Sequence, residues 1–392
     1  MTPAEVRALV PAARRRTYLD AAASSPLPTP VADAVREHLR EVEEEGDDGF
    51  PIWIAERERL RARLARFIGA TAREVAILGS TSAGFSVVAA MLAHRGVREV
   101  VTLEGEFPST AVPMLARGMT VRAARRRPDG SFTVDDVAAA MTKDTGAIAL
   151  SVVQFSSGFR IDLEGVSRLC KDRKVALCLN ASQALGQVPV DVGALGADFL
   201  CAACHKWMMA GYGMAAFFAR AEWLDACPLP IAGWTSVEPE VLWQTLGGAA
   251  TEETPAALVA RGARLRKDAA ALEGGGGTWS LYPALDAALE LHEAVGVDRT
   301  RAHVLELQRA LRAGLRARGF APNAPDDPER ASGICVIPVA GDPAAAVRAL
   351  SDERVVVTPR GGGVRLSTHV YNDASDVDAA LAAIDRAKVR PA

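Results

Sequence analysis

"CLNASQALGQVPVDVGALGADFLCAACHKWMMAGYG" (residues 178–213) places a single lysine, Lys206, between two apolar runs. The chain otherwise makes little use of lysine, because only six of its 45 basic residues are of this type. A lysine held in apolar surroundings has a lowered pKa and can act as an amine nucleophile or a base, whereas arginine cannot. The sequence therefore predicts that Lys206 is a reactive amine rather than a surface charge.

Short apolar runs alternate with helical patterns through the first part of the chain. Several runs are apolar without alternation, as in strands that are buried on both faces. This rhythm predicts an α/β fold with a mostly parallel sheet, and the closeness of the last two runs predicts an antiparallel pair. The predicted strands lie at 74–78, 98–103, 146–155, 175–180, 198–203 and 213–219.

The pattern changes near residue 290, where a long helical stretch precedes a few short strands and helices. A chain of 392 residues is also too long for one small core. We therefore expect a large α/β domain followed by a smaller C-terminal α+β domain. The predicted divisions are 1–30 for an N-terminal segment of the substrate site, 31–285 for the large domain and 286–392 for the small one.

The composition argues against several classes of partner. With a net charge of −3, the chain has no basic surface suited to nucleic acid. No apolar run approaches the length of a membrane span, and the N-terminus lacks the apolar core of a signal peptide, so we expect a cytoplasmic protein without a membrane partner. Most of the six cysteines lie in apolar runs, which favours buried thiols in a reducing compartment.

Metal ligands are weakly indicated. Cys201 and Cys204 form a CxxC pair, which leaves a zinc or redox site open as an alternative, but no second pair accompanies it. The six histidines show no ligand-like pair. We therefore expect no bound metal.

The stretch "LGSTSAGFS" (78–86) follows a predicted strand and opens a helix. Free backbone N–H groups at a helix N-terminus, together with the hydroxyls of Thr81 and Ser82, make an anion site, although an ordinary helix cap remains the alternative. Both this stretch and Lys206 lie at strand ends, where ligands of open α/β sheets bind. A phosphorylated aldehyde held as a Schiff base on Lys206 would use both, and pyridoxal phosphate is such a molecule.

Residues 178–213 resemble the class V aminotransferase family of fold-type I pyridoxal-phosphate enzymes, nearest its branch of cysteine desulfurases, selenocysteine lyases and isopenicillin N epimerase-like proteins. That family shows a strand ending in Asp-x-x-Gln, a Pro-Val-Asp segment, and His-Lys before a glycine-rich turn. Three further segments resemble it in the family's order: 17–28 at the substrate site, 105–114 with the aromatic that stacks on the pyridine ring, and 364–372 with the carboxylate-binding arginine. The resemblance thus covers nearly the whole chain.

The resemblance implies a role for each matching residue. Lys206 is the catalytic residue, which forms the Schiff base and moves the proton at the substrate α-carbon. Arg365 binds the substrate carboxylate, with Arg360 as a rival, and Ala22 lies in the substrate segment. The implied cofactor-binding residues are Thr81, Ser82 and His205 at the phosphate, Phe107 on the ring, Asn180 at the pyridine nitrogen, Gln183 at the phenolic oxygen, Gln154 nearby, and Thr278 from a neighbouring subunit of a homodimer.

The chain departs from the family's pattern at four places. Asn180 stands where the family has an aspartate that keeps the pyridine nitrogen protonated, and a neutral amide holds that proton less firmly. This favours elimination, decarboxylation or racemisation over transamination. Residues 350–363 contain no cysteine, so we expect no persulfide-forming desulfurase. Ala21 replaces a common asparagine, and Thr278 lies about two positions late in its segment.

The resemblance therefore implies a pyridoxal-phosphate enzyme that acts at the α-carbon of an amino acid or amine, with an aminotransferase-like reaction as the leading reading. A lyase that cleaves a Cβ–S bond or removes a carboxylate is the alternative, and an epimerase is another. A cofactor-free relative that serves as a scaffold is the alternative outside enzymes. The Arg- and Ala-rich composition suggests a high-GC bacterial source and secondary metabolite biosynthesis.

Overall fold

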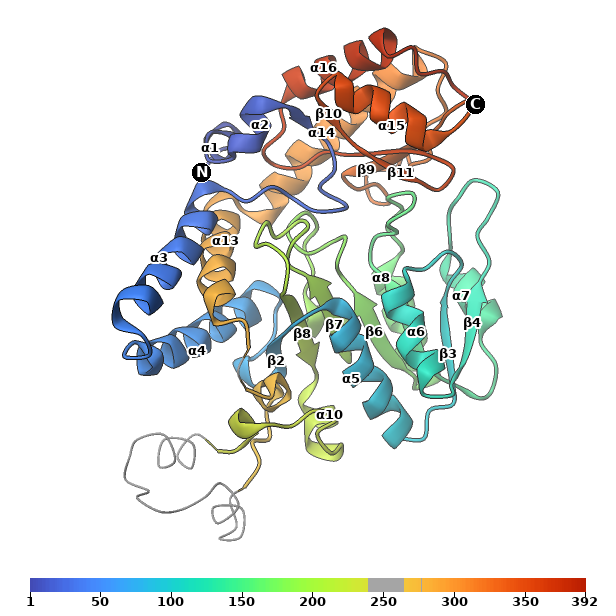
Figure 1. The fold of residues 1–392 in the computed structure, drawn as a ribbon. Helices are drawn as coiled ribbons and strands as arrows, with labels where there is room; N and C mark the ends of the chain where they lie inside the picture. The colour runs from blue at the N-terminus through green and yellow to red at the C-terminus, as the bar shows by residue number, and fades with distance from the viewer. Residues whose placement is uncertain (239–263, 276) are drawn as a thin grey trace.

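The computed structural model describes residues 1–238, 264–275 and 277–392, and its largest unit is a seven-stranded sheet of order β2-β8-β7-β6-β5-β3-β4 (Figure 1). Neighbouring strands from β7 through β4 pair in parallel, and β8 pairs antiparallel with both β2 and β7. The expected mostly parallel α/β fold and the antiparallel pair are therefore confirmed. The strands are β2 (Val75–Leu78), β3 (Glu99–Leu103), β4 (Thr120–Ala124), β5 (Thr145–Ser151), β6 (Ala176–Asn180), β7 (Phe199–Ala203) and β8 (Ala215–Ala219).

Strand β4 was not predicted, and its position explains why. It lies at the edge of the sheet and pairs only with β3. Three of its five residues are exposed, so it lacks the continuous apolar run of the central strands. A continuous apolar run is the pattern used to predict strands, so an edge strand with a charged residue such as Arg122 is mistaken for a loop.

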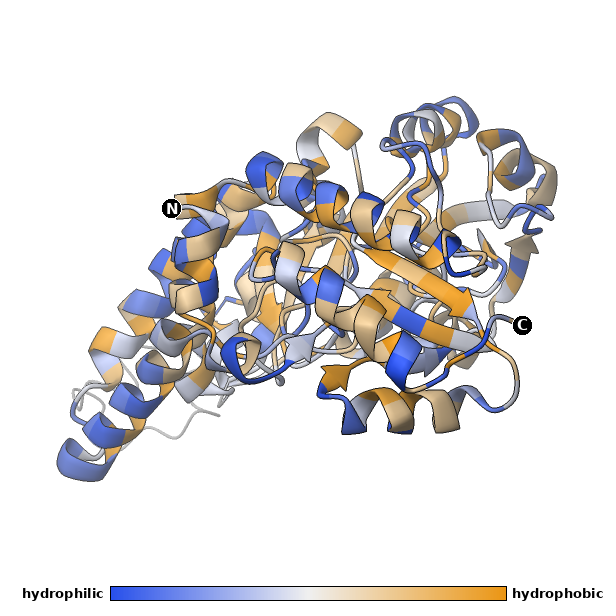
Figure 2. Ribbon diagram, turned by 90° about the horizontal axis from the view of Figure 1, so that it is seen from above, coloured by the Kyte–Doolittle hydropathy of each residue, from blue (hydrophilic) through white to orange (hydrophobic). Residues whose placement is uncertain are grey.

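Two apolar cores lie on opposite faces of the sheet, because successive side chains of a strand point to opposite sides. Ile148 and Leu150 of β5 belong to one core, whereas Ala147 and Ala149 belong to the other. Orange, hydrophobic strands between helices of mixed colour are seen from above in Figure 2. The helices of this part are α3 (Thr29–Glu45), α4 (Phe50–Phe67), α5 (Thr81–His94), α6 (Pro108–Ala116), α7 (Val134–Ala140), α8 (Leu163–Arg173), α9 (Val192–Leu195), α10 (Ala221–Ala226) and α13 (Tyr282–Val295).

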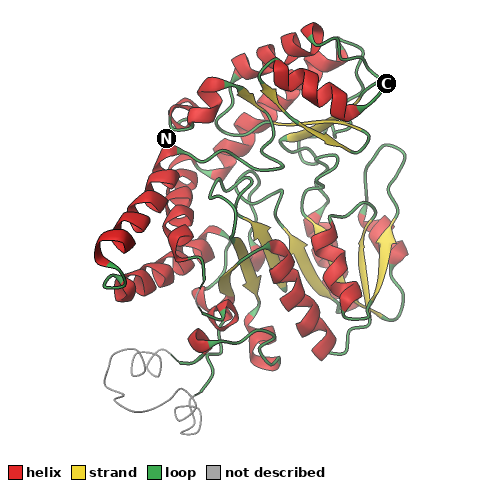
Figure 3. Ribbon diagram, in the orientation of Figure 1, coloured by secondary structure: helices red, strands yellow, loops and turns green. Residues whose placement is uncertain are grey.

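The C-terminal part forms a separate small sheet with its own core, seen at the top of Figure 3. Its three strands are antiparallel in the order β11-β12-β9. The predicted division at 285/286 falls inside the single helix α13, and the domain bounds remain a prediction. The elements here are α14 (Val297–Arg316), β9 (Ile334–Pro338), α15 (Pro343–Asp352), β10 (Val355–Val356), β11 (Thr358–Arg360), β12 (Gly363–Ser367) and α16 (Ala374–Arg386).

The strand of the N-terminal segment pairs with the C-terminal part and not with the large sheet. After α1 (Pro3–Ala8) and α2 (Pro11–Arg15), strand β1 (Thr17–Tyr18) pairs in parallel with β10. Asp20 then forms a bridge with Ser367 at the end of β12. Residues from the two ends of the chain therefore lie side by side next to the strand that carries Arg365.

A buried ion pair attaches residues 269–273 to the edge of the large sheet. Arg61 of α4 pairs with Glu273, and both side chains are 2% exposed. The carboxylate of Glu273 also accepts the backbone N–H of Ile77 in β2 at 2.8 Å. Glu273 also lies 3.7 Å from the buried Arg57, and Arg61 also pairs with the half-exposed Glu58 at 3.1 Å, so Glu273 is the buried carboxylate of a small charge network.

Replacing Glu273 by glutamine is expected to lower the free energy of unfolding by about 3 kcal/mol, because the change leaves the buried Arg57 and Arg61 with the half-exposed Glu58 as their acidic partner. Urea denaturation followed by circular dichroism measures the change. The matched control is Glu44→Gln, which removes an exposed partner of Arg40 and should cost less than about 1 kcal/mol. Equal effects of the two substitutions would contradict an anchoring role for Glu273.

Candidate active site

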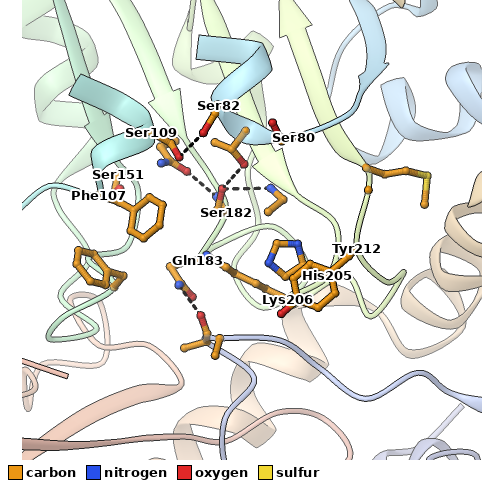
Figure 4. A pocket seen from close by; sticks show the side chains of 18 of the residues that line it. Ser80, Ser82, Phe107, Ser109, Ser151, Ser182, Gln183, His205, Lys206 and Tyr212 are labelled. Atoms are coloured by element: carbon orange, nitrogen blue, oxygen red, sulfur yellow. Dashed lines mark hydrogen bonds between the residues drawn. The ribbon is translucent and has the colours of Figure 1, made fainter. Parts of the chain in front are cut away.

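A cavity of about 400 Å³ lies where strands of the large sheet end, below the small sheet. Ser151, Asn180 and Ala203, the last residues of β5, β6 and β7, all line it. Figure 4 shows side chains from several loops converging on this space. The cavity brings together nine of the residues predicted from the sequence: Ala22, Thr81, Ser82, Phe107, Asn180, Gln183, His205, Lys206 and Arg365.

Lys206 follows the end of β7 and reaches into the cavity from a buried loop. Its Nζ lies 5.2 Å from the centroid of the Phe107 ring. Burial, followed by the positive charges of Arg365 and Arg360, lowers the pKa of Lys206 to about 8. The structure thus gives this lysine the low basicity that its apolar sequence neighbours predict.

Hydroxyl groups gather at the N-terminus of α5. Ser80 caps the helix by accepting the backbone N–H of Ala83 at 3.1 Å. The hydroxyl of Thr81 lies 3.0 Å from that of Ser182, and Ser82 lies 2.8 Å from Ser109 (Figure 4). Free N–H groups and hydroxyls at a helix N-terminus suit a phosphate, so the residues predicted for an anion are in place to hold one.

His205 stands beside this cradle, stacked on Tyr212 with 4.1 Å between ring centroids and 17° between planes. Burial and then the neighbouring charge of Lys206 lower the pKa of His205 to about 4. The imidazole is therefore neutral near pH 7 and can donate one hydrogen bond without adding a charge.

Asn180 at the end of β6 uses its amide within the protein. Nδ2 donates to the hydroxyl of Thr110 at 2.9 Å, and Oδ1 accepts the backbone N–H of Ser182 at 3.0 Å. None of the described residues that line the cavity carries a carboxylate. The nearby acid Glu106 lies outside the lining, hydrogen-bonded to Ser151, and burial raises its pKa. Asn180 therefore brings a neutral amide to the position where the family carries an acid.

Arg365 and Arg360 line the cavity from the small sheet. Arg365 is buried and donates to Asp20 at 3.3 Å and to the carbonyl of Phe155 at 3.2 Å. Burial raises the pKa of Asp20 and lowers that of Arg365. Arg360 is exposed, and its guanidinium lies 5.7 Å from the centroid of the Phe155 ring. Within the described residues it has no acidic partner.

Two of the predicted cofactor-binding residues do not line the cavity of their own chain. Gln154 lies behind it, where Nε2 donates to Glu106 at 3.3 Å and Oε1 is buried without a hydrogen-bond partner in the described part of the protein. Thr278 lies near the glycine-rich turn, and a Cβ added to Gly213 would come within 3.9 Å of its γ-carbon. Roles for both in cofactor binding remain predictions.

Sequence reasoning missed eleven lining residues, of which four are serines. Ser182 stands inside the recognised Asn-Ala-Ser-Gln run, and Ser109 follows Phe107 by two positions, so the neighbourhood of a motif was the available signal. Tyr212 stands inside the recognised glycine-rich turn, but no sequence pattern shows that this turn lays its ring on His205. The residues not predicted are Ala23, Gly79, Ser80, Ser109, Ser151, Phe155, Ser182, Ala203, Tyr212, Gly213 and Met214.

Other chemistries find less support in the described residues. Cys201 and Cys204 are buried and unpaired, and burial raises the pKa of the Cys204 thiol to about 12. No cluster of three or more potential metal ligands occurs in residues 1–238, 264–275 and 277–392. Within the same ranges no helix has the length and apolar character needed to cross a membrane.

The donor set fits pyridoxal phosphate. A low-pKa amine can bind its aldehyde, the N-terminus of α5 with its hydroxyls can hold its phosphate, and Phe107 offers an aromatic face to its ring. His205 and Gln183 add hydrogen-bonding groups around the same cavity. These are complementary partners for the aldehyde, the phosphate and the ring of a single molecule.

The free amine of Lys206 is expected to appear with a midpoint near pH 8. About a tenth of Lys206 is then neutral at pH 7, against roughly one in three thousand for an ordinary lysine. Trace acetylation with acetic anhydride across a pH series, read by mass spectrometry of the Lys206 peptide, measures the midpoint. Arg360→Gln should raise it, because that variant removes a repelling charge. A midpoint above about pH 10 in the wild type would contradict the lowered basicity.

The matches to known proteins agree with this geometry. A family model described as Aminotransferase class-V matches residues 17–380. The chain is 24% identical to a probable cysteine desulfurase of Methanothermobacter thermautotrophicus over 96% of each chain. It is 28% identical to a probable hercynylcysteine sulfoxide lyase of Mycobacterium tuberculosis, over 92% of this chain and 88% of the relative.

The fold comparison points the same way. The apo structure of a cysteine desulfurase from Thermococcus onnurineus matches with a TM-score of 0.85 at 23% identity, covering 98% of each chain. The family model includes the cradle at α5, Lys206 and Arg365, so the resemblance predicted from the motifs is confirmed. This chain belongs to the class-V aminotransferase family, and its cofactor is pyridoxal phosphate.

Proposed function

We propose that this protein is a pyridoxal-phosphate-dependent lyase that acts at the α-carbon of an amino acid and expels a group from the β-carbon. The observation that carries the proposal is the partly buried, weakly basic Lys206, which shares one cavity with a phosphate cradle and two guanidinium groups. When bound, pyridoxal phosphate supplies an aldehyde for the amine and a ring that takes up electrons from the α-carbon.

The residues of the chain would then divide the remaining work. Lys206 holds the cofactor before the substrate arrives, and its released Nζ can accept the α-proton because its pKa lies near the working pH. The N-terminus of α5, with Thr81 and Ser82, holds the phosphate end. Phe107 covers one face of the ring position and limits the access of water.

The two arginines define the carboxylate side of the substrate site. Arg365 keeps N–H groups beyond those given to Asp20 and Phe155, so it can bind a substrate carboxylate. Asp20 offsets one of the two positive charges, which leaves a net charge of about +1 on this wall. One carboxylate balances that charge, so we propose an amino acid with a single carboxylate and an uncharged side chain.

Asn180 favours elimination. A neutral amide does not hold the pyridine nitrogen protonated as a carboxylate does, so the ring withdraws electrons less strongly. Elimination uses the electron pair of the α-carbon at once to expel a β-substituent. The weaker electron withdrawal by the ring therefore slows elimination less than it slows a reaction in which the ring must hold that pair. Among the described residues that line the cavity there is no cysteine, which supports a reaction without a protein persulfide.

Amino transfer is the second candidate. The family includes it, and Lys206 is the only lysine among the described residues that line the cavity, so the same amine could return the proton to a different carbon. The two reactions share every binding residue. They differ in whether ammonia leaves or the amino group stays on the enzyme.

We also propose that the working form is a homodimer. Trp234 is 42% exposed and Ile231 is 40% exposed at the end of the described segment before residue 239. Trp234 lies 6.2 Å from Phe50, which in turn lies 5.0 Å from Trp279, so an aromatic surface adjoins Thr278. A second copy covering this surface would explain the predicted contribution of Thr278 to a neighbouring site. The resemblance to the family also implies that residues 233–239 contribute to the dimer; of these, residue 239 lies outside the described residues.

The test is an amino-acid panel with the cofactor-loaded protein and no keto-acid acceptor. A substrate with a β-leaving group should yield keto acid and ammonia in equal amounts over many turnovers, with water consumed and the leaving group released. Lys206→Ala should yield neither. Keto acid that stops at one equivalent per site, without ammonia, would identify an aminotransferase and contradict the lyase.

Replacing Asn180 by aspartate is expected to shift the enzyme toward amino transfer by about tenfold, because a carboxylate stabilises the protonated pyridine nitrogen by a charged hydrogen bond. The measured quantity is the ratio of amino transfer to ammonia release for one substrate. Asn180→Ala serves as the control, since it removes the amide without adding a charge. An unchanged ratio in Asn180→Asp would show that this position does not select the reaction.

A further inference from the structure

The indole of Trp207 hydrogen-bonds to Gln183 behind the cavity. Trp207 Nε1 donates to Gln183 Oε1 at 2.8 Å, and Nε2 of the same amide donates to the carbonyl of Ala22 at 2.8 Å. All three residues are buried. An indole N–H can only donate and a backbone carbonyl can only accept, so these two partners allow a single orientation of the amide.

That orientation determines what Gln183 can offer to a ligand. Gln183 lines the cavity, whereas Trp207 does not, so the amide oxygen is engaged away from the cavity. The amide nitrogen carries two hydrogens and gives one to Ala22. The second N–H of Gln183 Nε2 therefore remains as a donor for a ligand in the cavity. Gln183 is labelled in Figure 4.

Trp207 is itself held in place by His369. The two rings are stacked at 5.2 Å with 20° between planes. The N–H of Val370 donates to His369 Nδ1 at 2.6 Å, so the ring proton is on Nε2, which donates to the carbonyl of Trp207 at 3.0 Å. Burial lowers the pKa of His369 to about 3, which keeps this arrangement neutral and fixed.

We propose that Trp207 is a positioning residue that fixes Gln183 as a hydrogen-bond donor to the phenolic oxygen of the cofactor. The inference rests on the proposed function. A donor stabilises the anionic form of that oxygen. The oxygen then attracts less strongly the proton on the nitrogen that Lys206 contributes to the cofactor linkage, and the pKa of that nitrogen falls.

The experiment is a pH titration of the yellow absorption of the cofactor-loaded protein. Trp207→Phe removes the indole N–H and part of the ring, so that of the two bonds that orient the Gln183 amide only the bond to Ala22 remains, and the amide turns more easily. The apparent pKa of the colour change is expected to rise by about one pH unit, the size expected for losing one hydrogen bond. The matched control is Trp223→Phe, which removes an indole bond to Asp198 outside the cavity and should leave the pKa unchanged.

A double-mutant cycle separates positioning from stability. Gln183→Met has a similar shape but no donor, so it should raise the apparent pKa at least as much as Trp207→Phe. The two substitutions together should raise it no further than Gln183→Met alone. Additive shifts, or a Trp207→Phe protein that loses thermal stability with an unchanged pKa, would overturn the proposal.

Two outcomes remain to be assigned. Where Trp207→Phe does not fold, Gln183→Met decides, and an unchanged pKa in that variant overturns the role of Gln183 as the donor. A wild-type protein that develops no yellow absorption with pyridoxal phosphate contradicts the proposed function instead. The variants therefore test the role of Trp207, whereas the wild-type protein tests the proposed function.

Discussion

The position of the Lys206 amine beside two arginines determines the charge balance of the cavity. Lys206 lies in a cavity that also contains Arg360 and Arg365, so three cationic groups share a small volume. The repulsion among the three positive charges is reduced in a different way for each group. Lys206 loses part of its charge, Arg365 is paired with Asp20, and Arg360 reaches solvent across the ring of Phe155. Anionic ligands complete this balance, which is the physical reason for a phosphate and a carboxylate in one site.

Close backbone packing places the helix cradle next to that amine. Gly84 of α5 faces β7, where an added Cβ would come within 2.7 Å of the Cys201 sulfur. Only a residue without a side chain allows the helix to approach the strand so closely. The N-terminus of α5 and the loop after β7 therefore meet at one edge of the sheet. The buried thiol of Cys201, which could be taken for half of a metal pair, serves as packing in this contact.

The sequence predicted the fold wherever burial left a continuous apolar run. The five central strands of the large sheet were found for this reason, whereas the exposed edge strand β4 was not. Lys206, His205 and Thr81 were found from their motifs, and the cavity contains all three. Contacts between segments that are distant in the sequence could not be predicted from local pattern. Nothing in local pattern shows that Asp20 meets Arg365, that Tyr212 lies on His205, or that Trp207 orients Gln183.

The pairing of β1 with β10 and the bridge from Asp20 to Ser367 join the first residues of the chain to nearly the last. Such a pairing between distant segments has to await synthesis of the last part of the chain, and its closure adds an entropic cost that grows slowly with loop length. During synthesis, the large sheet could form while the final segment is still inside the ribosome. The site for the substrate carboxylate could not form at that stage, since Arg365 and its partner Asp20 come from opposite ends of the chain. A nascent chain could thus capture the cofactor before it is able to select a substrate.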